Sequence, residues 1–135
     1  MRSPVSIDLY SGSLRVRLKG PHRILEGEGK LKNGCLYTTL NASDKVIHMV
    51  FKLGKARNPN VLQGVFSGIS TSGDPIAGRE VWVKAAQENE NRIFNLENKG
   101  DKAALPQEVY RYFNDFGQNY IHIKRPSSFE LDDLI

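Results

Sequence analysis

Short stretches in which apolar and polar residues alternate recur through the first two thirds of the chain. In residues 13–19, for example, leucine and valine alternate with arginine and lysine. A period of two over this length is typical of an antiparallel strand with one buried face. The stretches for which we predict strands are 12–19, 24–32, 35–40, 45–54, 61–70 and 77–85.

Glycines interrupt two of these predicted strands, at Gly27 and Gly29 and again at Gly64 and Gly68. A glycine inside a strand indicates a bulge, a sharp bend or a close approach of another backbone. Six or more short strands with such bends favour a mainly β fold. We expect a strongly curved antiparallel meander or a small barrel of about six to eight strands.

The pattern changes after residue 85, where a polar segment precedes one stretch with helical spacing. Apolar residues at 109, 112, 113 and 116 follow the i, i+3, i+4, i+7 spacing of an amphipathic helix. Pro106 suits the first turn of this helix and Gly117 its end. We therefore predict one late helix near 106–116 that packs on the sheet, within a single domain of residues 1–125.

Length and composition agree with one domain that has a real core. The chain has 135 residues, of which 39% are hydrophobic and 25% charged. Its apolar runs are too short to span a bilayer, and residues 1–10 lack the apolar stretch of a secretory signal. A single cysteine, Cys35, excludes a disulfide within the chain. We expect a cytoplasmic protein that does not insert into membranes, and its oligomeric state stays open.

Positive charge is concentrated in the part of the chain that is rich in strands. Residues 1–84 carry 13 Lys and Arg against 6 Asp and Glu. A basic surface attracts phosphates, nucleic acid or acidic partners. If neighbouring strands pair, one face could bind single-stranded nucleic acid, with Tyr37 and Trp82 as possible stacking platforms. The five cations of this stripe are Arg15, Arg17, Lys19, Lys30 and Lys32.

The loop that follows residue 69 has the composition of a binding motif but not its spacing. The sequence SGISTSGDPIAG lacks the lysine of a phosphate-binding loop and the Gly-x-Ser-x-Gly of a nucleophile elbow. Asp74 followed by Pro75 suits the start of a turn. We therefore predict a hairpin turn here.

Candidate catalytic groups are scattered along the chain. His22, His48 and His122 do not have the spacing of metal ligands, and no acid–base pair can be recognised. We expect a protein that is not an enzyme, with no metal site and no cofactor.

A ligand site is expected among polar residues that share a strand face with apolar ones. In a small barrel, a few such groups could converge on one small molecule. Arginine is well suited to binding a carboxylate or a phosphate, so we predict a small anionic ligand. The predicted ligand-binding residues are Arg79, Gln63, Ser67 and His48, with Trp82 at the rim.

The last ten residues, 126–135, have a different composition and form an acidic, hydrophobic tail. Residues 127–135 read SSFELDDLI, a composition typical of a short peptide that docks on a protein partner. In outline this tail resembles those of bacterial single-stranded DNA-binding proteins, although their Asp-rich run ending in Pro-Phe is absent. The preferred function is a sensory or regulatory binding module for a small anion. A single-stranded nucleic-acid-binding protein and a pure protein-interaction domain are the alternatives.

Overall fold

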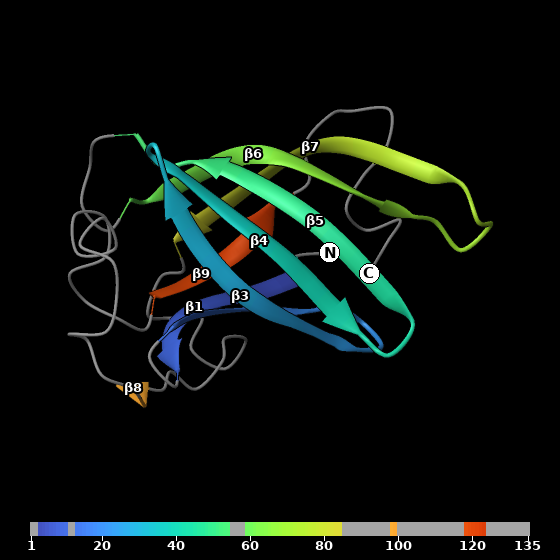
Figure 1. Cartoon of the computed structure of the whole chain (residues 1–135), viewed down its shortest axis with the longest axis horizontal. Helices are drawn as coiled ribbons and strands as arrows, with labels where there is room; N and C mark the ends of the chain where they lie inside the picture. Colours follow the sequence, from blue (N-terminus) through green and yellow to red (C-terminus); the bar gives the residue numbers. More distant parts are fainter. Residues whose placement is uncertain (1–2, 11–12, 55–58, 85–97, 100–117, 124–135) are drawn as a thin grey trace.

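The computed structural model describes residues 3–10, 13–54, 59–84, 98–99 and 118–123, and within them the protein is built from strands (Figure 1). The predicted mainly β fold is thereby confirmed. The strands are β1 (Ser3–Tyr10), β2 (Ser13–Lys19), β3 (Ile24–Lys32), β4 (Cys35–Ala42), β5 (Lys45–Lys52), β6 (Val61–Ile69), β7 (Pro75–Lys84), β8 (Asn98–Lys99) and β9 (Gln118–Ile123).

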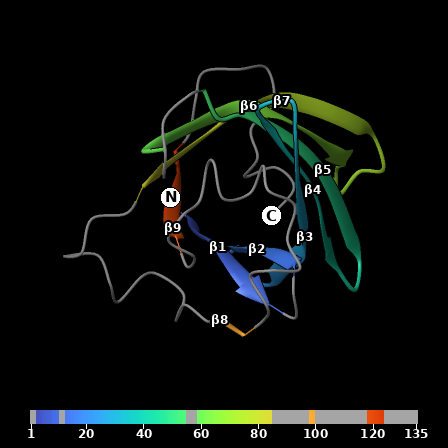
Figure 2. The ribbon, with the colours of Figure 1, turned by 60° about the vertical axis from the view of Figure 1, so that its left-hand side comes forward.

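Strands β1 to β7 form an antiparallel meander in which each strand pairs with the next. The sheet is strongly curled into a half-barrel, as Figures 1 and 2 show from two directions. Strand β9 pairs with β7 on one side and with β1 on the other, whereas the two residues of β8 pair with β1 in parallel. The meander predicted from the alternation is therefore present.

The described residues form no helix. They therefore include no helix that is long and apolar enough to cross a membrane. The helix predicted near 106–116 and the tail 126–135 lie outside the described residues. The division of the chain at residue 125 stays a prediction for the same reason.

The inner face of the curled sheet holds one apolar cluster. Alternate residues of β2 and β5 point into it, as their sequence patterns predict. The ring centroids of Phe51 and Trp82, both members of the cluster, lie 4.2 Å apart. Its largest fully buried side chains are Trp82, Tyr120, Phe51, Phe66, Ile7, Leu14, Leu18, Leu25, Leu36 and Leu40.

Two of the strand glycines lie where neighbouring backbones approach closely. A Cβ atom at Gly27 would collide with the carbonyl oxygen of Thr39, and one at Gly64 with that of Val50. Only a residue without Cβ fits at these two positions, so both glycines permit the curvature of the sheet. This agrees with the close approach predicted from the sequence.

The loop after β6 is a hairpin turn, as predicted. Strands β6 and β7 pair from Ile69 opposite Pro75 to Val61 opposite Val83. The backbone N–H of Ser70 donates to the carbonyl oxygen of Asp74 at 2.8 Å, and the N–H of Gly73 donates to that of Ser70 at 2.9 Å. Gly73 has a φ of 88°, a conformation that favours glycine.

Candidate functional site

An open groove of about 560 Å³ crosses the outer face of β5, β6 and β7. We call it the outer groove. Two cross-strand rows build it, because residues that face each other in an antiparallel sheet point to the same side. The residues that line it are His48, Val50, Val65, Phe66, Ser67, Ala77, Gly78 and Arg79.

The register of the strands decides which side chains meet in the outer groove. Val50 faces Val65, which in turn faces Arg79, so the first row is apolar and ends in a cation. In the second row, His48 faces Ser67 and Ser67 faces Ala77. Val65 is 54% exposed although it is aliphatic, which makes the apolar part of the groove accessible.

Three of the predicted ligand-binding residues, His48, Ser67 and Arg79, therefore lie together. They lie on the outer face of the sheet, whereas we expected them in the interior. Gln63 is also exposed on the outer face, but it faces Lys52 and Val81 and does not line the groove.

The misplacement has a simple cause in β6. This strand carries apolar residues on both faces, and Val61, Val65 and Ile69 are the exposed set. Leu62 and Phe66 are the buried set. Gly64 and Gly68 lie on the same inner face of the strand as these two residues. Because the glycines leave the inner face of β6 with few large side chains, the exposed valines and isoleucine suggested the wrong face.

Trp82, expected at the rim of a pocket, is in the core instead. Its side chain is fully buried, and its ring is tilted by 38° against that of Phe51. It can therefore serve neither as a rim aromatic nor as a stacking platform for bases. The sequence suggested an exposed position because Trp82 shares a strand face with the charged Glu80. Glu80 is itself buried, and its carboxylate accepts a hydrogen bond from the N–H of Val81 at 2.9 Å.

A second hollow, of about 460 Å³, continues the outer face from β5 across β4 to β3. His48 and Val50 line both this hollow and the outer groove. Nδ1 of His48 lies 3.0 Å from Oγ1 of Thr39. This contact holds the imidazole between the second hollow and the outer groove. Tyr37 is 43% exposed and faces Lys30 across the strand pair.

The predicted basic stripe is divided by the structure into two parts. Arg15 and Arg17 both bind the carboxylate of Asp8, which is fully buried, with Nη2–Oδ2 distances of 2.9 Å and 3.2 Å. Nε of Arg17 also donates to the hydroxyl of Ser6 at 3.2 Å. These two arginines are therefore held in an ion-pair network.

The three lysines of the stripe have a different environment. Lys19, Lys30 and Lys32 are exposed, so their ammonium groups are accessible to a polyanion. Acidic residues accompany the arginines across the strand pair, since Arg15 faces Glu28 and Arg17 faces Glu26. The positive field of this face is therefore weaker than the sequence alone suggested.

Tyr120, whose role was not predicted from the sequence, connects β9 to the loop before β6. Its hydroxyl is buried and donates to the carbonyl oxygen of Pro59 at 2.9 Å. Burial raises the pKa of this hydroxyl well above its usual value. The only sequence signal was an aromatic residue within a late alternating stretch.

Within the described strands and turns, no three His, Cys, Asp or Glu side chains are close enough to hold a metal ion. Comparisons of the chain with protein-family models, with curated proteins and with solved structures found no match.

Proposed function

We propose that the protein is a non-catalytic binding module that holds a small anionic molecule with an apolar body in the outer groove. The observation that carries this proposal is the row Val50–Val65–Arg79, in which an exposed aliphatic surface ends at a guanidinium group. We also propose that β1 to β7 and β9 close into a small barrel, because β9 pairs with both β7 and β1.

The chemistry of the groove suits such a ligand. A guanidinium group offers a planar set of N–H donors that matches a carboxylate or a phosphate. The apolar body of the ligand would cover Val50 and Val65, whose exposed area is otherwise in contact with water. Ser67 and His48 add a hydroxyl and an imidazole for orienting hydrogen bonds.

Binding is favoured over catalysis by the way His48 is engaged. His48 and Ser67 are cross-strand neighbours, which raises the question of a nucleophile and base pair. The imidazole Nδ1 contacts Oγ1 of Thr39 on the opposite side, and among the described residues no hydrogen bond joins the imidazole to the hydroxyl of Ser67. A serine nucleophile needs a hydrogen bond to its base, and this is the contact that the described residues do not make.

A thermal-shift screen with chemically matched pairs tests the proposal. Benzoate and octanoate supply an anion on an apolar body, and benzamide and octanamide are their neutral counterparts. Phenyl phosphate, without a neutral counterpart, tests a second kind of anion. The anionic members are expected to raise the melting temperature, and the neutral members are not. Arg79→Ala should weaken binding about tenfold or more, since a hydrogen bond to a charged group contributes about 1.5–3 kcal/mol.

Lys52→Ala is the matched control, because Lys52 is an exposed cation on β5 outside the outer groove. It should leave binding unchanged. Val65→Ser should weaken binding of octanoate more than binding of acetate, since only octanoate has a long apolar body. Equal stabilisation of wild type and Arg79→Ala by the anions would contradict the proposal.

A second candidate function, single-stranded nucleic-acid binding, is favoured by one observation only: exposed Tyr37 lies beside Lys30 in the hollow over β3 to β5. Bases stack on exposed aromatic rings, and lysines attract the phosphates. Fluorescence polarisation with labelled single-stranded DNA and RNA at two salt concentrations tests it. Binding that falls steeply with salt and with Tyr37→Ala supports this function, and absence of binding at low salt removes it.

A further inference from the structure

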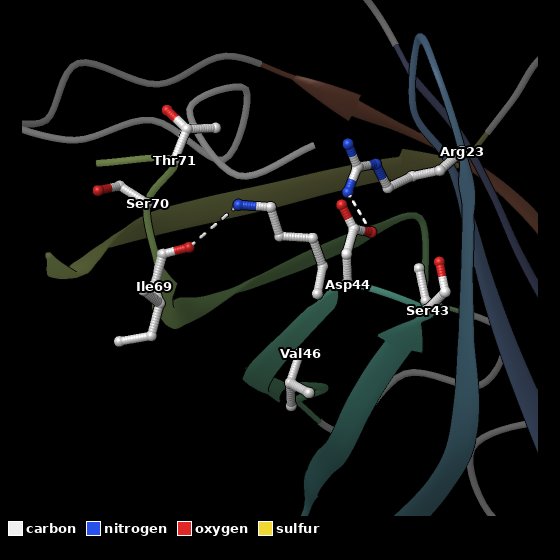
Figure 3. Close-up of a pocket in the computed structure, with 9 residues that line it drawn as sticks. Arg23, Ser43, Asp44, Val46, Ile69, Ser70 and Thr71 are labelled. Carbon is white, nitrogen blue, oxygen red and sulfur yellow. Dashed lines mark hydrogen bonds and ion pairs between the residues drawn. The ribbon is translucent and has the colours of Figure 1, made fainter. Parts of the chain in front are cut away.

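A larger concavity, of about 670 Å³, lies where three turns meet at one end of the sheet (Figure 3). We call it the turn hollow. The segments that meet there are the turn before β3, the hairpin between β4 and β5, and the hairpin between β6 and β7. The residues that line it are Arg23, Ala42, Ser43, Asp44, Lys45, Val46, Ile69, Ser70 and Thr71.

Two cations from different turns reach the turn hollow. Arg23 forms an ion pair with Asp44. Lys45 donates a hydrogen bond from Nζ to the carbonyl oxygen of Ile69 at 3.3 Å. An ammonium group has three N–H donors, so the bond to Ile69 leaves donor capacity on Lys45.

The charges of the turn hollow do not balance, because its lining contains two cations and one carboxylate. Asp44 is 59% exposed, so water screens it strongly. The Nε atom of Arg23 is buried and has no hydrogen-bond acceptor among the described residues. A buried donor without an acceptor is destabilising, so this guanidinium group is not fully satisfied by Asp44.

Neutral hydroxyl groups also line the turn hollow. Ser43 and Thr71 contribute hydroxyls, whereas the hydroxyl of Ser70 is engaged within its own turn by Ser72 and by the N–H of Asp74. Figure 3 shows Ser70 and Thr71 on the turn opposite Arg23. Hydroxyl groups donate hydrogen bonds to phosphate and carboxylate oxygens. The SGISTSGDP segment thus contributes to this concavity although its backbone forms an ordinary hairpin turn.

We propose that the turn hollow binds a small oxyanion, a phosphate or carboxylate group, through Arg23 and Lys45. The hydroxyls of Ser43 and Thr71 add to the donor set. The turn hollow and the outer groove share no lining residue, so this proposal is independent of the proposed function.

NMR titration of the ¹⁵N-labelled full chain tests the proposal, with inorganic phosphate in one arm and acetate in the other at low ionic strength. The amide signals of Lys45, Ser70 and Thr71 are expected to shift in at least one arm. Shifts with both anions indicate a general oxyanion site, whereas shifts with phosphate alone indicate a phosphate site. Absence of shifts at these residues in both arms overturns the proposal.

Two substitutions with opposite expected signs make the test specific. Lys45→Gln removes a cation and should weaken binding about fivefold to tenfold. Asp44→Asn removes the carboxylate that competes for Arg23, so the anion should bind several times more tightly. A nonspecific loss of folding would weaken binding in both variants, and the fluorescence of Trp82 reports on folding. Unchanged or weakened binding in a folded Asp44→Asn variant overturns the proposal.

Arg79→Ala and Lys52→Gln are the controls. Both remove an exposed cation outside the turn hollow and should leave its affinity unchanged. If Arg79→Ala abolishes the phosphate or acetate shifts at Lys45, the anion binds in the outer groove and the turn hollow is not a site.

Discussion

The curvature of the sheet depends on Gly27, and its replacement by alanine should destabilise the protein strongly. The alanine Cβ would overlap the carbonyl oxygen of Thr39 and lie 2.9 Å from its carbonyl carbon. Both are backbone atoms, so the overlap is relieved only if β3 moves away from β4. Gly29, two residues along the same strand, provides the matched comparison.

The structure sets different magnitudes for the two glycines. At Gly29 the nearest atoms are side-chain carbons of Leu36 and Val16, both 3.1 Å from the added Cβ, and side chains can shift by a few tenths of an ångström. Overpacking of this type costs about 1 kcal/mol. At Gly27 the overpacking cost of about 1–3 kcal/mol is joined by the loss of strand hydrogen bonds, each about 1 kcal/mol. We expect Gly27→Ala to lower the free energy of unfolding by about 3 kcal/mol.

Urea unfolding followed by the fluorescence of Trp82 measures both effects. Trp82 is the single tryptophan and is buried beside Phe51, so its emission shifts to the red when the core opens. The slope of the transition should be similar in wild type and Gly29→Ala, which identifies a change in stability. Equal stabilities of the Gly27→Ala and Gly29→Ala variants would refute the backbone overlap as the reason for glycine at position 27.

Two further predictions concern buried polar groups. Asp8→Ala should lower the free energy of unfolding by about 3 kcal/mol in the same urea assay, because Arg15 and Arg17 lose a fully buried partner. A change below about 1 kcal/mol would contradict this expectation. Tyr120→Phe should remove part of the alkaline destabilisation. Burial raises the pKa of the Tyr120 hydroxyl, so above pH 10 the unfolded chain loses this proton before the folded protein does. The free energy of unfolding of the wild type therefore falls by about 1.4 kcal/mol per pH unit relative to that of the variant. Parallel pH profiles between pH 9 and 11.5 would contradict this.

The alternation in β2 and β5 predicted both the strands and their buried faces. In β2 the side chains of Leu14, Val16 and Leu18 point inward. In β5 those of Ile47, Met49 and Phe51 do so. Burial of apolar area dominates the free energy of folding, so a strand with one clearly apolar face has one reasonable orientation. The hairpin at Asp74–Pro75 was also predictable, because the turn depends on local backbone preferences.

The faces of β6 and β7 could not be predicted in this way. Val61, Val65 and Ile69 are exposed on β6, while Glu80 is buried on β7. The neighbouring strands decide which face of β6 is buried. Phe51 of β5 lies opposite Gly64, so the face that carries the glycines is covered by a large buried side chain. The sequence of β6 alone does not contain that information.

The candidate sites show the same division. The sequence by itself determined that most of the described chain forms antiparallel strands, that glycines bend them, and that Arg79, Ser67 and His48 are polar groups among apolar neighbours. Only the tertiary structure decided that these three share an outer groove, that Arg15 and Arg17 bind Asp8, and that Arg23 and Lys45 reach one hollow. The physical reason is that strand preference and turn chemistry are local, whereas register and curvature determine which distant side chains meet.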